Sequence, residues 1–182
     1  MNQASLSKAL FLDRDGIINI DHGYVSKIED FEFTEGIFDL LKLFINEGYT
    51  LFIVTNQSGI GRGYYTQKDF TTLTQWMLDA FKKENITIES VEHCPHAPEE
   101  KCACRKPNTG MIEAILSKQR VDLKNSWMIG DKQSDIDLAH NATIQHTISI
   151  GDRKIHGSEL SFASILECCY YFEKHQNKIK IS

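Results

Sequence analysis

The chain has 182 residues, which suits a single domain with a substantial core, and its hydrophobic fraction of 41% is ordinary for a globular protein. Its 20 basic and 25 acidic residues give a formal net charge of −5, which argues against nucleic-acid binding. No apolar stretch approaches the roughly 20 residues of a membrane helix, and residues 1–8 lack the apolar segment of a signal peptide. We therefore expect a cytoplasmic protein that does not enter a membrane.

The first part of the chain predicts strands and helices in alternation. An apolar run over 10–12 predicts a buried strand, and a helix rich in Leu and Phe follows over 37–47. A strand over 51–54 leads into a glycine-rich loop over 59–63, and Thr66 is the expected N-cap of the next helix. That helix has apolar residues at helical spacing, which indicate core packing: Phe70, Leu73, Met77 and Phe81.

The second part of the chain continues the alternation. Strands are expected over 88–91, 127–129 and 147–150, and helices over 111–119, 135–140 and 162–174. Repeated strand–helix units with short connections predict an α/β fold, a doubly wound and mostly parallel sheet with helices on both faces. The chain contains no repeats, linkers or low-complexity runs, so we expect one domain over 1–182.

Two carboxylates, Asp13 and Asp15, directly follow the first predicted strand. Ligands of an open parallel sheet bind beyond the carboxyl ends of its strands, and residues two apart point to the same side, so both side chains should share one pocket. Two like charges this close require either a divalent cation or a proton on one of them. An isolated Asp-x-Asp pair is more often a solvated turn, and its meaning depends on the other strand ends.

Three further polar segments are expected at the same edge of the sheet. Thr55 and Asn56 follow the second strand and can hydrogen-bond phosphate oxygens. Asp131 and Asp135 follow a later strand, and Lys106 stands before a predicted helix. In this order the four segments resemble the haloacid dehalogenase superfamily of aspartate-nucleophile phosphatases. The ordered set is a much stronger signal than any one of its motifs.

Four potential zinc ligands lie within the loop 94–104, with the spacing Cys-x-His-x5-Cys-x-Cys. Three thiolates and one neutral imidazole are a standard tetrahedral zinc set, whereas a disulfide is disfavoured in a reducing compartment. Since no ligand position stays open, we expect a structural Zn²⁺ that stiffens the loop and aims Arg105 and Lys106 at substrate. The neighbouring His93 should face away. The expected ligands are Cys94, His96, Cys102 and Cys104.

Two loops bring the resemblance closer than a superfamily. Residues 19–25 read Asn-Ile-Asp-His-Gly-Tyr-Val, and residues 55–63 read Thr-Asn-Gln-Ser-Gly-Ile-Gly-Arg-Gly. With the Arg-Lys-Pro that closes the zinc loop, they are similar to the cap-less, zinc-containing D-glycero-D-manno-heptose 1,7-bisphosphate 7-phosphatase family. The similarity runs from about residue 9 to 151. Histidinol-phosphate phosphatase is the alternative activity, and a non-catalytic zinc-stabilised binding module is the alternative of a different class.

The resemblance implies a Mg²⁺-dependent phosphatase with an aspartyl-phosphate intermediate. Asp13 would attack phosphorus, and Asp15 would protonate the departing sugar oxygen and later accept a proton from water. Thr55 and Lys106 would hold phosphoryl oxygens. Asp135 is expected behind the metal ligands and not among them. The residues expected to hold Mg²⁺ are Asp13, Asp15 through its backbone carbonyl, and Asp131.

The resemblance also implies a small sugar bisphosphate as the partner of a monomer. The gaps after the first two strands are too short for a cap domain, so the active site should be open and its loops should select the substrate. Arg105 has its own chemical claim, because a guanidinium grips phosphate bidentately, while Asp21 and His22 equally suit a polar turn. The expected substrate contacts are Asp21, His22, Gly23, Tyr24, Asn56, Gln57, Ser58, Arg105 and Lys132.

Overall fold

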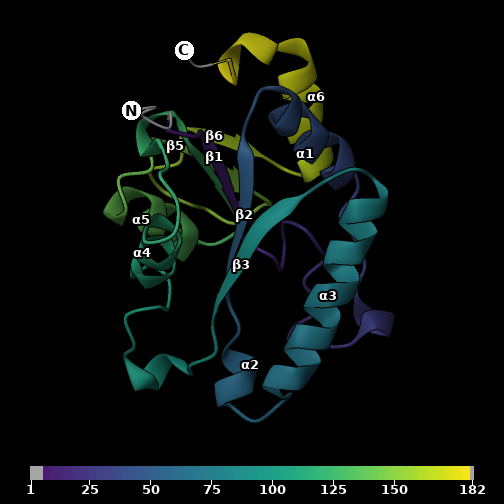
Figure 1. The fold of residues 1–182 in the computed structure, drawn as a ribbon, viewed down its shortest axis with the longest axis vertical. Coiled ribbons are helices and arrows are strands. Elements are labelled where there is room, and N and C mark those ends of the chain that lie inside the picture. Colours follow the sequence, from purple (N-terminus) through teal and green to yellow (C-terminus); the bar gives the residue numbers. More distant parts are fainter. Residues whose placement is uncertain (1–5, 181–182) are drawn as a thin grey trace.

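A six-stranded parallel sheet forms the centre of the computed structural model, which describes residues 6–180 (Figure 1). The strand order is β3-β2-β1-β4-β5-β6. The strands are β1 (Ala9–Leu12), β2 (Thr50–Asn56), β3 (Ile88–Cys94), β4 (Trp127–Gly130), β5 (His146–Ile150) and β6 (Leu160–Phe162). The predicted doubly wound α/β fold is confirmed. Residues 1–5, on which the expected lack of a signal peptide partly rests, lie outside the described range.

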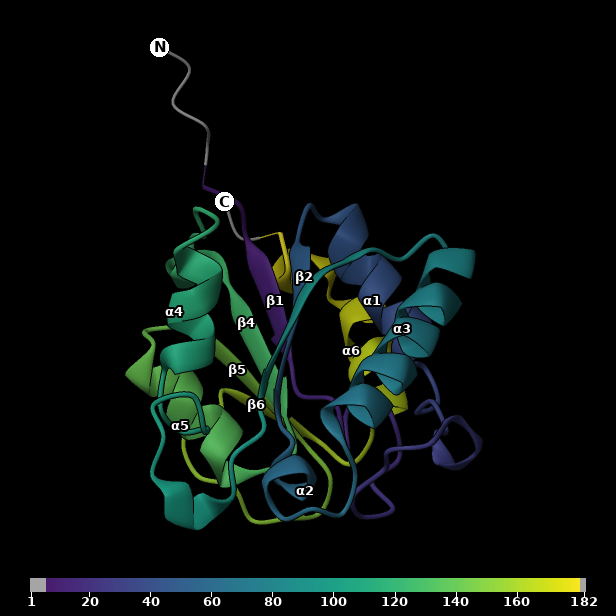
Figure 2. The ribbon, with the colours of Figure 1, turned by 60° about the horizontal axis from the view of Figure 1, so that its bottom comes forward.

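Helices cover both faces of this sheet (Figures 1 and 2). One face carries α4 (Gly110–Leu116) and α5 (Gln133–Asn141), and the other carries α1 (Ile37–Asn46), α3 (Gln67–Lys83) and α6 (Ile165–Lys174). The short α2 (Ser58–Gly61) follows β2. Short 3-10 helices occupy Ile28–Asp30, Pro98–Glu100, Leu123–Asn125 and Gln176–Lys178. Within residues 6–180, no helix combines the length and the apolar character that a membrane crossing requires.

The two-residue period of the strands divides the core between the two faces. Along β1, Leu10 and Leu12 pack with the cluster under α1, α3 and α6, whereas Ala9 and Phe11 pack with the cluster under α4 and α5. All four side chains are completely buried. A central strand buried on both faces reads as a continuous apolar run, which is why the sequence located β1 well.

The predicted start of α3 is confirmed in atomic detail. The Thr66 hydroxyl oxygen accepts the Asp69 N–H at 3.1 Å, and the Asp69 carboxylate accepts the Thr66 N–H at 2.7 Å. This reciprocal pair satisfies backbone donors that the first turn leaves free. The apolar stripe that follows is buried, as expected from its spacing: Phe70, Leu73, Met77 and Phe81.

Several predicted boundaries are wrong. The helix expected over 111–119 ends at Leu116, and the glycine-rich loop over 59–63 begins inside the helical turn α2. The helix expected over 162–174 starts at Ile165, because Phe162 belongs to β6, a strand that was not predicted. The Ser164 hydroxyl accepts the Glu167 N–H at 3.1 Å and so fixes the true start of α6.

Candidate active site

The strand order explains why motifs far apart in the sequence share one site. Because β1 lies between β2 and β4, the carboxyl ends of these three strands are neighbours. Thr55 lies in the last part of β2, Asp13 follows β1 directly, and Asp131 follows β4 directly. In a sheet of this order, the crevice beyond the strand ends is the general ligand site.

Three buried carboxylates lie together at this edge, and two of them pair with a buried ammonium group. Lys106 Nζ lies 2.9 Å from Asp13 Oδ1 and 2.7 Å from Asp135 Oδ1. One oxygen from each of Asp13, Asp131 and Asp135 lies within 4.8 Å of the other two. Burial opposes the charge on Lys106, but the carboxylates outweigh it and raise the pKa of this lysine. The predicted residues Asp13, Lys106 and Asp131 are thus brought together, and Asp135 lies against them.

The donor set of this carboxylate cluster fits a hard divalent cation. Burial raises the pKa of Asp13 to about 7, an effect that Lys106 moderates and Asp135 reinforces. Burial likewise raises the pKa of Asp131, whose buried Oδ1 accepts no hydrogen bond from the described residues. Oxygen ligands whose negative charge is only partly compensated are the preferred environment of Mg²⁺.

Two glycines allow the acidic groups to approach the backbone closely. Gly16 has a φ of +90°, and a Cβ placed on it would lie 2.6 Å from Asp131 Cγ. A Cβ on Gly130 would lie 2.1 Å from the Asp135 Cβ. Any side chain at either position would displace a carboxylate of the cluster.

Asp15 belongs to a separate hydrogen-bond network beside the carboxylate cluster. Its Oδ1 accepts from Arg14 Nη2 at 2.8 Å and from Asn19 Nδ2 at 3.1 Å, and its Oδ2 accepts from Gln57 Nε2 at 2.9 Å. Burial alone would raise the pKa of Asp15, but Arg14 and the neighbouring donors lower it below its ordinary value. The network therefore holds Asp15 as an oriented carboxylate.

Sequence reasoning missed Arg14 and Asn19 as parts of this site. Arg14 is 1% exposed, and its Nη2 also donates to the Val25 carbonyl at 2.7 Å, which ties Asp15 to the loop over 21–25. One sequence signal could have identified Arg14: it lies between Asp13 and Asp15 at the end of a buried strand. A charged residue that is buried there must be paired with an opposite charge.

A pocket of about 330 Å³ opens beside Asp15 and Lys106. His22 is not part of its lining; it borders a neighbouring hollow, where its Nε2 lies 3.7 Å from Glu32. Lys132 Nζ lies 3.3 Å from Asp21 Oδ2 and so joins two of the lining loops. The lining includes the other residues predicted to contact substrate: Asp21, Gly23, Tyr24, Asn56, Gln57, Ser58, Arg105 and Lys132.

Asn56 uses its side-chain amide to hold the loop that carries Lys106. Its Oδ1 accepts the Lys106 N–H at 3.0 Å, and its Nδ2 donates to the Lys106 carbonyl at 3.4 Å. The end of β2 therefore fixes the height of the Arg-Lys-Pro segment above the sheet. The sequence around Asn56, at the end of β2, shows no pattern that predicts its pairing with Lys106, which lies 50 residues further along the chain.

Arg153 reaches the site from a segment in which the sequence showed no motif. Its Nη1 lies 2.5 Å from Asp131 Oδ2 and donates to the Asp131 carbonyl at 3.1 Å. It lines a second pocket of about 540 Å³, which adjoins the first at Asp21. The segment after β5 thus contributes a cation to the carboxylate cluster.

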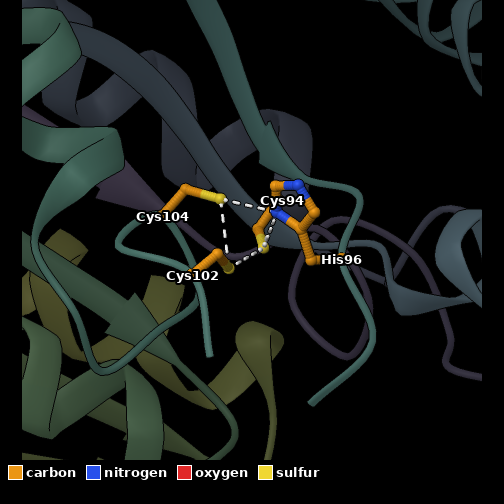
Figure 3. Close-up of side chains that lie close together, drawn as sticks. All are labelled: Cys94, His96, Cys102 and Cys104. Atoms are coloured by element: carbon orange, nitrogen blue, oxygen red, sulfur yellow. Dashed lines mark hydrogen bonds between the residues drawn. The ribbon is translucent and has the colours of Figure 1, made fainter. Parts of the chain in front are cut away.

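The predicted zinc ligands converge in the loop that follows β3 (Figure 3). His96 Nδ1 lies 3.2 Å from Cys104 Sγ and 3.7 Å from Cys94 Sγ, and Cys102 Sγ lies 3.4 Å from both other sulfurs. These separations resemble the edges of about 3.8 Å in a tetrahedron of sulfurs 2.3 Å from zinc. None of the five cysteines of the described chain is in a disulfide.

His93 lies outside this group, as its strand position predicts. Its Nε2 is 3.0 Å from Gln67 Oε1, and its ring stacks on Phe70 with centroids 4.2 Å apart. Adjacent residues of a strand point to opposite faces, so Cys94 enters the zinc loop while His93 faces α3.

Comparison with known proteins agrees with this geometry. The HAD-hydrolase-like family model matches residues 103–148. The chain is 47% identical over 169 residues to D-glycero-alpha-D-manno-heptose-1,7-bisphosphate 7-phosphatase of Campylobacter jejuni, covering 92% of this chain and 97% of that protein. It is 52% identical over 143 residues to the D-glycero-beta-D-manno-heptose-1,7-bisphosphate 7-phosphatase of Helicobacter pylori, covering 78% and 83%.

Solved structures agree at the level of the fold. The crystal structure of D,D-heptose 1.7-bisphosphate phosphatase from B. bronchiseptica, complexed with magnesium and phosphate, superposes with a TM-score of 0.79 at 23% identity, covering 92% of this chain and 99% of that one. A putative HAD-like phosphatase from Mesorhizobium loti gives a TM-score of 0.79 at 26% identity, covering 91% and 85%.

The fold, the ordered motifs and these relatives define a phosphatase of the haloacid dehalogenase superfamily. Such enzymes are phosphoric monoester hydrolases, which disfavours the non-catalytic zinc module considered from the sequence. Within the superfamily, the chain belongs to the D-glycero-D-manno-heptose-1,7-bisphosphate 7-phosphatase family.

Proposed function

We propose that the protein removes the 7-phosphate of D-glycero-D-manno-heptose 1,7-bisphosphate, a step toward activated heptose precursors of lipopolysaccharide and related glycans. The observation that carries this proposal is the meeting of Asp13, Lys106 and Asp131 in one crevice, beside a pocket that contains Arg105 and Lys132. A sugar bisphosphate has a second anionic end, which these two cations suit. The names of the relatives support the same substrate class.

In the proposed reaction, Asp13 is the nucleophile and Asp15 the general acid and base. A carboxylate oxygen of Asp13 bonds to phosphorus as the bond to the sugar oxygen breaks. Asp15 enters this step in its protonated form, which is the minor form in the free protein because its pKa is lowered, and it gives that proton to the sugar oxygen. A water then attacks the aspartyl-phosphate, Asp15 takes its proton, and phosphate leaves Asp13. Thr55 and Lys106 hold the phosphoryl oxygens during both steps, and the burial of both side chains strengthens these contacts. For this, Lys106 Nζ exchanges one of its three contacts, with Asp13, Asp135 and the Val54 carbonyl, for a phosphoryl oxygen.

Mg²⁺ is the proposed catalytic ion, held by Asp13, Asp131 and the Asp15 carbonyl. When bound, it screens the negative charge between the Asp13 carboxylate and the substrate phosphate. Asp135 supports this site from behind, because its Oδ2 accepts the N–H groups of Asp131 and Lys132 at 3.1 and 3.0 Å. Asp135 is completely buried and bonded to Lys106, so it fits a supporting role better than a ligand role.

The second proposed ion is a structural Zn²⁺ on Cys94, His96, Cys102 and Cys104. All four positions of a tetrahedron would be filled by protein, which leaves none for substrate. Arg105 and Lys106 follow Cys104 directly, so the ion would stiffen the segment that carries these two cations.

We further propose that residues 1–182 act as one domain and as a monomer in the cytoplasm. Two hydrophobic clusters share the central sheet, which supports a single domain. Free thiols at all five cysteines support a reducing compartment.

The test is phosphate release in Mg²⁺ from both anomers of D-glycero-D-manno-heptose 1,7-bisphosphate, with histidinol phosphate alongside. We expect one heptose anomer to be turned over fastest, and Asp13→Asn to lower kcat at least about a thousandfold, because the nucleophile is lost. Thermal unfolding should show that this variant folds. Preference for histidinol phosphate would contradict the proposed substrate, and full activity of Asp13→Asn would contradict the proposed nucleophile.

A further inference from the structure

Gln57 is buried beside the pocket, and its side-chain amide is engaged by protein groups. It is 2% exposed. Its Nε2 donates to Asp15 Oδ2 at 2.9 Å and to Thr55 Oγ1 at 2.8 Å, and its Oε1 accepts from the Tyr65 hydroxyl at 2.5 Å. A primary amide has two N–H donors, and both are used here. Gln57 therefore has no N–H left for a sugar hydroxyl, although the loop resemblance placed it among the sugar contacts.

Gln57 holds the second oxygen of the Asp15 carboxylate. Arg14 and Asn19 both bind Oδ1, and Gln57 binds Oδ2. The terminal torsion of an aspartate is soft, so a carboxylate gripped at one oxygen still swings about that contact. Contacts at both oxygens fix the plane of the group and thus the direction in which a proton is given or received.

Tyr65 holds the end of the Gln57 amide that faces away from Asp15. The Asp15 carboxylate only accepts hydrogen bonds, so Gln57 presents Nε2 to it, and the Tyr65 hydroxyl donates to Oε1 on the other side. Burial raises the pKa of Tyr65 to about 12, so the hydroxyl keeps the proton that it donates. The Tyr65 ring packs directly against Gly59, where a Cβ would lie 2.1 Å from Tyr65 Cε1. This contact explains why the turn Gln-Ser-Gly has glycine and no larger residue at its third position.

We propose that Gln57, anchored by Tyr65, is a positioning residue that holds Asp15 for proton transfer and does not bind the sugar. The inference rests on the proposed function, because it takes Asp15 as the general acid and base. Thr55 anchors the other N–H of the amide, so the end of β2 and the loop after β1 are joined through one side chain. The arrangement places the proton-transfer group and the phosphate-binding hydroxyl at a fixed spacing.

The test compares two phosphate esters that differ in their need for a general acid. A sugar alkoxide must be protonated as it leaves, whereas nitrophenolate leaves without a proton. We expect Gln57→Met to lower kcat/KM for heptose bisphosphate about 30- to 100-fold, and for p-nitrophenyl phosphate no more than about threefold. The hydrolysis of aspartyl-phosphate needs Asp15 as a base for either ester, so p-nitrophenyl phosphate should show a burst of nitrophenol before a slower steady state.

Two further variants separate positioning from general damage. Tyr65→Phe removes only a hydroxyl, and it should show the same pattern at about three- to tenfold. Gln75→Met makes the matched substitution on an exposed part of α3, where Gln75 bonds only Asp79 among the described residues, and it should behave as wild type.

Three results would count against the proposal in different ways. A raised KM for the sugar bisphosphate with unchanged kcat and no burst would make Gln57 a sugar ligand. Equal losses on both esters without a burst would make its role merely structural. Absence of turnover of both esters by the wild-type enzyme would overturn the proposed function, and the positioning role with it.

Discussion

The two groups of potential metal ligands are held in different ways. The carboxylates of Asp13, Asp131 and Asp135 stand at the ends of central strands or in the helix that follows. Asp13 and Asp135 pair with Lys106, Asp135 also accepts two backbone N–H groups, and Asp131 pairs with Arg153. The sulfurs and the imidazole of the zinc loop lie in a loop after β3, and they contact one another (Figure 3). The sheet preorganises the first group, whereas the second would depend on the proposed Zn²⁺ for rigidity.

The largest expected effect comes from removing Lys106, the cation that pairs with two carboxylates of the first group. Lys106→Met leaves Asp13 and Asp135 buried without their shared partner, and removing one member of a buried charge pair costs about 3 to 5 kcal/mol. We expect the free energy of unfolding in urea to fall by this amount. We also expect activity to be lost, since Lys106 is the residue proposed to hold the phosphoryl group.

A control for this variant is Lys118→Met, which removes an exposed lysine paired with Glu92 at 3.2 Å. Exposed ion pairs contribute little, so its free energy of unfolding should match that of wild type within about 0.5 kcal/mol. Equal stability of Lys106→Met and wild type would show that the sheet holds the carboxylates without their cation.

Zinc removal should have a smaller and more local effect. A chelator selective for zinc over Mg²⁺ should loosen the loop over 94–104 and misplace Arg105 and Lys106, which lowers activity about 10- to 100-fold. Hydrogen exchange should increase in that loop while α1, α3 and α6 keep their protection. Cys102→Ser should lose zinc by elemental analysis, whereas Cys168→Ala, outside the group, should retain one ion per chain. Unfolding of the whole chain on chelation would contradict the expectation that zinc stabilises only the loop over 94–104.

The smallest expected effect lies outside both groups. Ser164→Ala removes the hydroxyl that caps α6, a change that costs about 1 kcal/mol. The midpoint of urea unfolding should fall, and both kcat and metal content should stay constant. A change in either would mean that Ser164, which lines the second pocket together with Asp131 and Arg153, also acts on the site.

The sequence predicted the central strands and their motifs because each combined two signals. β1, β2 and β4 are continuous apolar runs that end abruptly in polar residues, and buried parallel strands require that pattern. The grouping of Cys94, His96, Cys102 and Cys104 was equally visible, since their spacing along the chain is short, and zinc ligation by them stays a prediction. The N-cap Thr66 and its partner Asp69 in α3 could be predicted for the same reason, a short and specific spacing.

The remaining features lacked local signals. β6 has only three residues and none of them is fully buried, so it has no apolar run to detect. Glycines at 59 and 61 argued for a loop, yet tertiary contacts fold that segment into the turn α2. The contacts of Arg153 with Asp131 and of Tyr65 with Gln57 depend on how loops meet in space, which spacing along the chain does not encode.

The edges of the sheet bear on how the protein behaves at high concentration. An unpaired, apolar strand edge recruits other chains and seeds aggregation. Within the described chain, one edge is the three-residue β6, and the other is β3, where Glu89 and Glu92 bond Gln119 and Lys118 at 2.7 and 3.2 Å. A very short strand at one edge and charged side chains at the other give the fold a built-in protection against sheet extension between molecules.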